Sequence, residues 1–199
     1  MKYPIDVQNE LLEHLLHTAK NTEIGKQYDF ASISTYREFA ERVPVTSYED
    51  NHLQIERARK GESNIFWPTP IKWFAKSSGT TGNKSKYIPV SKESIGDCHY
   101  KGGKDLLAIY CSNFPTKNIF NGKSVMLGGS HSISKLSSKM KEGDLSAIIM
   151  EQLPFWVRMQ QSPKLTIALM DDWEEKIELM TEQTIHQNVS SLSGVPTWT

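Results

Sequence analysis

The chain has 199 residues, of which 38% are hydrophobic and 10% aromatic, and its 23 basic and 23 acidic side chains give a formal net charge of zero. This length and composition predict a globular chain with a sizeable core and exclude an intrinsically disordered one. The sequence contains no run of about 18 apolar residues, so no transmembrane helix is predicted. The N-terminus also lacks the apolar core of a signal peptide. We therefore expect no membrane partner and a cytoplasmic location.

Residues 1–64 predict a helical section. Apolar residues recur on one face of a helix over residues 6–19, a short helix is expected over 35–42, and 25–34 is expected to be a loop. The run from Thr46 to Glu49 is typical of a capping box that opens a helix reaching about Lys60, with Gly61 as its cap. His14 and His17 stand three residues apart, but no further ligand completes a metal set, so no metal site is predicted.

The next stretch predicts two strands joined by a loop rich in glycine and hydroxyl groups. Residues 71–76 and 86–90 are β-prone, and Pro89 favours an edge position for the second strand. Convergent hydroxyl and backbone donors, glycines without Cβ and a nearby cation suit phosphate oxygens. The candidate phosphate-binding residues are Ser77, Ser78, Gly79, Thr80, Thr81, Gly82 and Lys86.

This loop does not match the GxxxxGK[ST] pattern of Walker A loops, and the next helix signal comes only at Ser91. An ordinary Ser/Thr/Gly-rich hairpin turn is the alternative on composition alone. Ser77 lacks the GxSxG or SxxK context of a nucleophile, so a serine hydrolase is disfavoured.

Helices and strands alternate in the rest of the chain, which indicates an α/β class with a mixed sheet and flanking helices over residues 65–199. A helix is expected over 91–112, although its Gly102-Gly103 pair requires close packing or a kink. A buried strand over 124–127 then leads into a glycine turn at residues 128–131, where His131 could face a ligand. The remaining expectations are a Ser/Lys-rich segment over 130–142, helices over 143–152, from Pro154 and over 172–186, and a strand over 188–192.

Trp73, Trp156 and Trp173 are expected in the core, and Trp173, Ile177 and Met180 are expected to face inward from the helix that Asp172 caps.

Positive charge is concentrated in the middle of the chain. Residues 65–141 carry 12 basic and three acidic side chains, whereas the flanking segments are both acidic on balance. A positive field around the loop suits a polyphosphate ligand, although unselected surface charge is the alternative. The lysines are scattered and no nucleic-acid-binding signature is present, so no nucleic-acid partner is expected.

The loop sequence from Ser77 to Pro89 resembles the phosphate-binding motif of the adenylate-forming superfamily, which includes luciferase and acyl-CoA ligases. Its Ser-Ser start, its late Lys86 and the Pro89 beyond it are similar to the plant auxin-responsive acyl-amido synthetases (the Gretchen Hagen family) and their bacterial relatives. The segments 43–50, 55–62 and 193–198 also resemble that family, although only the loop is strongly specific. The chain departs from the superfamily pattern at Lys84, which stands where proline is usual.

This resemblance implies an ATP-dependent acyl-acid amido synthetase, with residues 65–199 as the first part of its adenylation domain. Mg-ATP and a carboxylic acid would give an acyl-adenylate, and an amino acid amine would then attack the activated carbonyl. Lys86 would supply the catalytic cation, and Ser77 to Gly82 would bind the β- and γ-phosphates. Two alternatives stay open: acyl transfer to a thiol, as in acyl-CoA ligases, and a nucleotide-binding module without chemistry.

The family completes its site with a second motif that ends in a glutamate, an aspartate for the ribose and a small C-terminal domain. The sequence offers no counterpart to these parts. We therefore expect the chain to be a fragment or a truncated product that is incomplete as a catalyst. We also expect it to need a partner surface or to self-associate through uncovered apolar faces.

Overall fold

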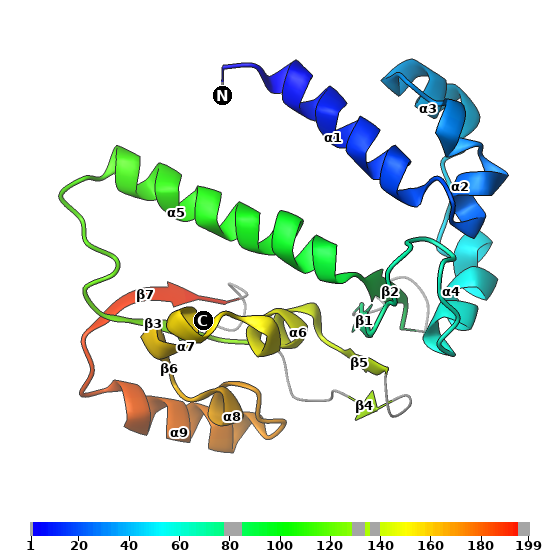
Figure 1. Ribbon diagram of the computed structural model, residues 1–199. Helices are drawn as coiled ribbons and strands as arrows, with labels where there is room; N and C mark the ends of the chain where they lie inside the picture. Colours follow the sequence, from blue (N-terminus) through cyan, green and yellow to red (C-terminus); the bar gives the residue numbers. More distant parts are fainter. Residues whose placement is uncertain (1, 78–84, 129–133, 136–139, 195–199) are drawn as a thin grey trace. The chain divides into compact units, whose positions relative to one another are not determined.

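The computed structural model describes residues 2–77, 85–128, 134–135 and 140–194, which divide into two compact units. The first unit comprises Met1–Lys72 with Leu136–Met140, and the second comprises Trp73–Lys135 with Lys141–Thr199. Together they form a mixed α/β structure, as the sequence predicts (Figure 1). Among the described residues, no helix has both the length and the apolar character needed to cross a membrane.

The first unit is helical. It contains α1 (Pro4–Ala19), α2 (Glu23–Gln27), α3 (Tyr36–Arg42) and α4 (His52–Arg59), with single 3₁₀ turns at Phe30–Ser32 and Glu49–Asn51. The predicted loop over 25–34 is therefore wrong in part, because the end of α2 and the first 3₁₀ turn fall within it. On α1 the apolar face is only partly covered: Leu16 and Ala19 are buried, but Val7, Leu11 and Leu15 are exposed.

The caps of these helices are local. Before α4, the reciprocal bonds of a capping box are formed by Ser47 and Asp50, so the predicted box from Thr46 to Glu49 is displaced by one residue. At the end of α4, Gly61 has φ +98° and ends the helix as predicted, since only glycine takes that conformation without strain.

Arg57 joins α4 to α2 and to the segment that follows α4. Its guanidinium donates to both carboxylate oxygens of Glu23, at 2.9 and 2.6 Å, and its Nε donates to Glu62 at 2.8 Å. These hydrogen bonds lower the pKa of both carboxyl groups below the ordinary glutamate value. One arginine therefore fixes three segments of the first unit.

The second unit begins with the predicted hairpin. Strand β1 (Trp73–Lys76) pairs antiparallel with β2 (Tyr87–Val90), with Trp73 opposite Val90 and Lys76 opposite Tyr87. On its other side β1 pairs parallel with β5 (Lys141–Gly143). The two-residue β4 (Ser134–Lys135) pairs antiparallel with β5, so the strand order of this sheet is β2-β1-β5-β4. No strand was predicted here: β4 lies in the Ser/Lys-rich segment over 130–142, and β5 runs from its end to the first residue of the helix predicted over 143–152.

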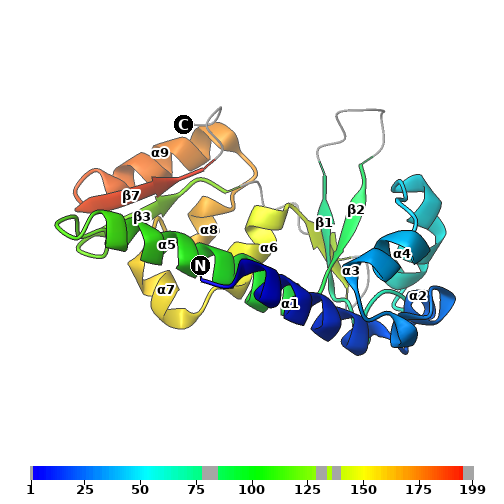
Figure 2. The same cartoon turned by 90° about the horizontal axis from the view of Figure 1, so that it is seen from above.

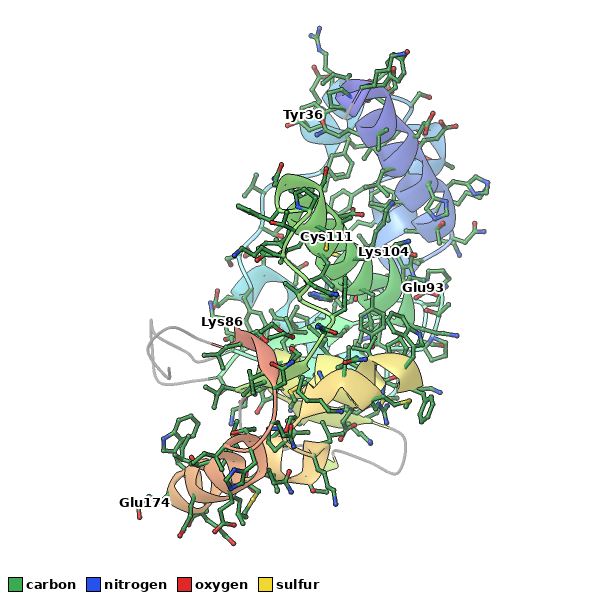
Figure 3. All side chains as sticks on the ribbon, turned by 90° about the vertical axis from the view of Figure 1, so that its left-hand side faces the viewer. Tyr36, Lys86, Glu93, Lys104, Cys111 and Glu174 are labelled. Atoms are coloured by element: carbon green, nitrogen blue, oxygen red, sulfur yellow. The ribbon has the colours of Figure 1, made fainter. Side chains whose placement is uncertain are left out.

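A long helix follows the hairpin, as predicted. Ser91 caps it, because its Oγ accepts from the amide of Ser94 at 2.9 Å. A π-helical segment (Ser94–Tyr100) leads directly into α5 (Lys101–Asn113), from which Lys104 and Cys111 project (Figure 3). Side chains added at Gly102 or Gly103 would meet no described atom within 4 Å, so close packing does not explain the glycine pair.

A second sheet is entirely parallel, with β3 (Lys123–Met126) between β6 (Gln161–Ser162) and β7 (Val189–Ser193). Its connections contain α6 (Leu145–Gln152), α7 (Phe155–Gln160), α8 (Leu165–Ala168) and α9 (Trp173–Thr184). Asp172 caps α9 as predicted, by accepting from the amide of Glu175 at 3.0 Å. The predicted core position of Trp156 is wrong, since it is 70% exposed on α7.

Helix α6 packs against elements of both sheets (Figure 2). Ile148, which is fully buried, belongs to one apolar cluster with Ala75 and Val90 of the hairpin and Ile95 of the long helix. From the same helix, Ala147 and Met150 pack with Ala168 and Leu169, and Met126 of β3 lies against that cluster. The core of this unit is therefore shared between the hairpin and the parallel sheet through one eight-residue helix.

Replacing Ile148 with alanine should lower the free energy of unfolding by about 2–5 kcal/mol, because the variant leaves a cavity among fully buried side chains. Urea denaturation followed by circular dichroism measures this change. The matched control is Ile109→Ala on α5, where the side chain is 61% exposed and the same truncation should change the free energy of unfolding by less than about 1 kcal/mol. Equal losses from the two variants would contradict the role assigned to α6.

Candidate functional site

The structure places the two ends of the predicted phosphate-binding loop side by side. The amide of Ser77, directly after β1, donates to the carbonyl of Lys86, directly before β2, at 2.9 Å. Because side chains alternate across a strand, Ser77 and Lys86 share the face of the hairpin that carries Ala75, which packs against α6. Ser78, Gly79, Thr80, Thr81 and Gly82 lie outside the described residues, as does His131.

The elements around the loop are those that the sequence predicts. A strand runs into the loop, a second strand leaves it at Tyr87, and the following helix starts only after Ser91. In a Walker A loop the chain enters a helix directly, so this arrangement differs from that class of phosphate site.

The loop leaves β1 at an edge where other elements also end. Because β1 and β5 are parallel and Ala75 is opposite Gly143, their carboxyl ends lie together, and α6 starts directly after Asp144. Ligands of α/β sheets usually bind outside the carboxyl ends of the strands. The hairpin therefore presents Ser77 and Lys86 at the kind of edge where ligands are expected.

Part of the positive charge in the middle of the chain has a structural role. The ammonium of Lys141 lies 4.5 Å from the centroid of the Trp73 ring and 3.4 Å from a carboxylate oxygen of Glu151. The ammonium of Lys123 donates to the carbonyl of Met159 at 2.7 Å. These two lysines connect strands to neighbouring segments.

A second feature lies at the carboxyl end of β3, where Lys176 of α9 is fully buried. Its ammonium donates to the carbonyl of Gly128 at 2.8 Å and lies 5.3 Å from the centroid of the Trp173 ring. Burial lowers the pKa of this lysine below its ordinary value, and attraction by Asp171 and Asp144 acts against that shift. The sequence pattern does not predict the burial of Lys176, and the predicted inward positions of Trp173 and Ile177 are wrong, since both side chains are exposed.

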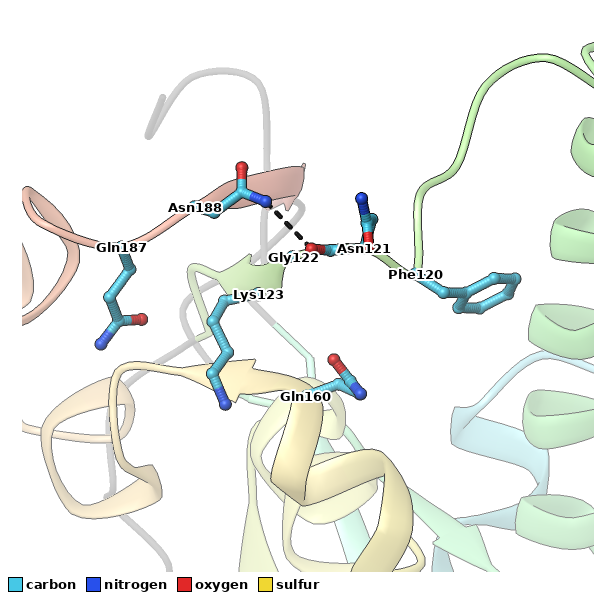
Figure 4. A pocket seen from close by; sticks show the side chains of 7 residues that line it. All are labelled: Phe120, Asn121, Gly122, Lys123, Gln160, Gln187 and Asn188. Atoms are coloured by element: carbon cyan, nitrogen blue, oxygen red, sulfur yellow. Dashed lines mark hydrogen bonds between the residues drawn. The ribbon is translucent and has the colours of Figure 1, made fainter.

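A pocket of about 400 Å³ lies at the other end of the parallel sheet (Figure 4). It is formed at the amino ends of β3, β6 and β7 and is lined by Phe120, Asn121, Gly122, Lys123, Gln160, Gln187 and Asn188. The Asn188 side chain donates to the carbonyl of Asn121 at 2.9 Å, which closes part of the pocket wall. Its position is therefore opposite to the strand ends where ligands of such sheets usually bind.

Comparison with known proteins identifies a matching family. A family model described as "GH3 family N-terminal domain" matches residues 1–198. Indole-3-acetic acid-amido synthetase GH3.2 of Arabidopsis thaliana is 34% identical over 93 residues, which are 46% of this chain and 17% of that protein. Indole-3-acetic acid-amido synthetase GH3.4 of the same plant is 36% identical over 93 residues, which are 46% of this chain and 16% of that protein.

Two solved structures share the fold. The chain resembles AtGH3.15 acyl acid amido synthetase in complex with 2,4-DB with a TM-score of 0.64 and 22% identity, over 83% of this chain and 29% of that one. A second structure of GH3.15 acyl acid amido synthetase gives a TM-score of 0.67 and 21% identity, over 86% and 30%. The chain therefore spans less than a fifth of these curated relatives and less than a third of these solved chains.

Two glycine substitutions should have opposite effects on stability. A Cβ at Gly122, beside the pocket, would lie 2.3 Å from the backbone carbonyl oxygen of Asn188, so Gly122→Ala should lower the free energy of unfolding by about 1–3 kcal/mol. Gly102→Ala adds a methyl group in open space on α5 and should raise it by about 0.5–1 kcal/mol, since glycine is unfavourable inside helices.

Urea denaturation of both variants provides the measurement. A destabilised Gly102→Ala variant would mean that the glycine pair has a packing role that its surroundings in the described structure do not indicate.

Proposed function

Because the chain belongs to the GH3 family, with its N-terminal domain over residues 1–198, we propose that residues 77–86 bind the triphosphate of Mg-ATP in an acyl-acid amido synthetase. The observation that carries this proposal is the hairpin, which brings Ser77 and Lys86 together at the carboxyl end of β1. The names of the relatives add support, because they are amido synthetases.

The proposed reaction has two steps. A carboxylate oxygen of the acid attacks the α-phosphorus of ATP, and the bond to the bridging oxygen of pyrophosphate breaks, which leaves an acyl-adenylate. The nitrogen of an amino acid then attacks the acyl carbon, AMP departs with the electrons of the acyl–oxygen bond, and the nitrogen loses a proton. The products are an amide, AMP and pyrophosphate.

The residues of this chain act on the leaving group in the first step. Ser77, Ser78, Gly79, Thr80, Thr81 and Gly82 would offer hydroxyl and backbone donors to the β- and γ-phosphates. Lys86 would place a point charge beside the same oxygens, where it offsets the negative charge that develops on pyrophosphate. Mg²⁺ enters with ATP, since it is usually held largely by substrate phosphates and water.

Two other functions are compatible with a loop that binds triphosphate. An enzyme of the acyl-CoA ligase type would form the same acyl-adenylate but transfer the acyl group to a thiol. A module without chemistry would bind the nucleotide and release it unchanged. Acid-dependent exchange of labelled pyrophosphate into ATP identifies an adenylating enzyme, and the requirement for an amine or a thiol in product formation identifies the acceptor.

Lys86→Ala should weaken the binding of Mg-ATP by about 1.5–3 kcal/mol, because it removes a charged donor from the triphosphate. A phosphorus NMR titration of the 199-residue chain detects millimolar binding and resolves the three phosphates. We expect the β- and γ-phosphate resonances of ATP to shift when the unmodified chain is added. With the Lys86→Ala variant, the same shifts should require a much higher protein concentration.

The controls are Lys84→Ala and Lys72→Ala. The first removes a positive charge two positions before Lys86 and the second removes one directly before the hairpin, so both should change the affinity for Mg-ATP much less. AMP, which lacks the β- and γ-phosphates, should bind the unmodified chain and Lys86→Ala with similar affinity. The assignment of Lys86 would be wrong if Lys86→Ala bound Mg-ATP as well as the unmodified chain does.

A further inference from the structure

Lys176 is the most deeply buried charged side chain among the residues that the structure describes, with an exposed fraction of 0%. Its neighbours on α9 behave as residues of a surface helix: Glu174, on the first turn, points away from the rest of the unit (Figure 3), and Ile177 is partly exposed. The face of α9 that meets the core therefore carries an ammonium group where an aliphatic residue would be ordinary.

The surroundings of Lys176 and Gly128 are apolar except for a few polar groups. Next to Gly128 lie the sulfur of Met150 and the side chain of Leu169, so tightly that a Cβ on Gly128 would meet that sulfur at 2.8 Å. The lysine ammonium reaches the carbonyl of Gly128, and the carboxylates of Asp144 and Asp171 attract it electrostatically.

Packing alone does not account for a lysine at this position. Removing an ammonium from water costs several kcal/mol, whereas methionine would fill a similar volume without that cost. A methionine would not, however, supply a donor to Gly128. This glycine is buried. It follows Leu127, whose amide makes a backbone hydrogen bond to the carbonyl of Ser193 in β7 at 2.8 Å. A buried carbonyl without a donor is itself destabilising.

We propose that Lys176 is a positioning residue, whose ammonium fixes the carbonyl of Gly128 and thereby sets the direction in which the backbone leaves β3 at the carboxyl edge of the sheet. Gly128 also packs against Met150 of α6, the helix that follows β5 at the carboxyl end of β1. Lys176 therefore acts on ligand binding through the backbone, without touching the ligand. The choice of ligand rests on the proposed function, whereas the contact with Gly128 does not.

The test compares Lys176→Met, which keeps an unbranched side chain only one atom shorter and removes the donor, with Lys164→Met. Lys164 lies on the surface of the same unit, just before α8, so its replacement removes the same charge without affecting Gly128. Each variant is studied at a temperature at which circular dichroism shows that it is fully folded. If Lys176→Met does not fold, Lys176→Gln, which retains a shorter uncharged donor, replaces it, and smaller effects are expected.

The first readout is hydrogen exchange, which needs no ligand. The amide of Leu127 should exchange about tenfold faster in Lys176→Met, the effect of losing one hydrogen bond to a charged group, whereas the amide of Val125 within β3 should be unchanged. A purely global loss of stability would accelerate both amides together. Unchanged exchange at Leu127, or equal acceleration at both positions, would overturn the proposal.

The second readout is the affinity for Mg-ATP from the phosphorus NMR titration. Lys176→Met should raise the dissociation constant about tenfold and Lys164→Met should leave it unchanged. Faster exchange at Leu127 with unchanged Mg-ATP affinity would show that Lys176 only stabilises the fold, and would also overturn the proposal. If the unmodified chain bound no Mg-ATP, the proposed function and the ligand part of this inference would fail, while the exchange measurement would still decide whether Lys176 fixes the end of β3.

Discussion

The burial of α6 is the constraint on which the second unit depends. An isolated two-stranded hairpin is only marginally stable in water, and a three-stranded sheet needs at least one covered face. Helix α6 meets both needs, since Ile148 packs on the hairpin while Ala147 and Met150 pack in the cluster beside β3. Because protein interiors are close-packed, a shift on one side of this helix cannot be absorbed without a response on the other. The hairpin that carries the proposed phosphate-binding loop and the cluster beside β3 therefore pack on the same helix.

The polar interactions of this unit follow from that packing. Burying α6 and α9 against the end of β3 leaves the backbone of Gly128 without access to water, and Lys176 supplies its donor. Near the hairpin, Lys141 lies between an aromatic ring and a carboxylate and so helps to hold β5 beside β1. Lysines in this chain therefore serve two purposes, and their number alone overstates the charge that is available to a ligand.

The sequence predicts the features that local chemistry determines. The hairpin, the cap at Ser91 and the cap at Asp172 each depend on residues within a few positions of one another, and all three are found in the structure. The burial of Lys176 depends on Gly128, which lies 48 positions earlier, so periodicity along α9 selected Trp173 and Ile177 instead. The two-residue strands β4 and β6 also escape prediction, because strands that short carry no periodicity and exist only through their partners.

The same limit applies to the candidate site. Residue types and spacing identify the loop and its two ends, Ser77 and Lys86, since a phosphate-binding loop is a continuous segment. The carboxyl end of β3 and helix α6 come together through contacts between distant segments, such as Gly128 against Met150, which one sequence does not reveal.

The position of Pro89 affects whether the edge of the hairpin can pair with a strand of another chain. In an antiparallel ladder, hydrogen-bonded and non-hydrogen-bonded residue pairs alternate. Ser77 and Lys86 form a hydrogen-bonded pair, so Pro89 and Phe74, three positions further along the ladder, form a non-hydrogen-bonded pair. The backbone nitrogen of Pro89 therefore points away from β1. Proline has no N–H to offer there, and a foreign strand that approached this edge would lose a hydrogen bond and meet the proline ring. The β2 edge of the hairpin is therefore a poor template for amyloid-like growth.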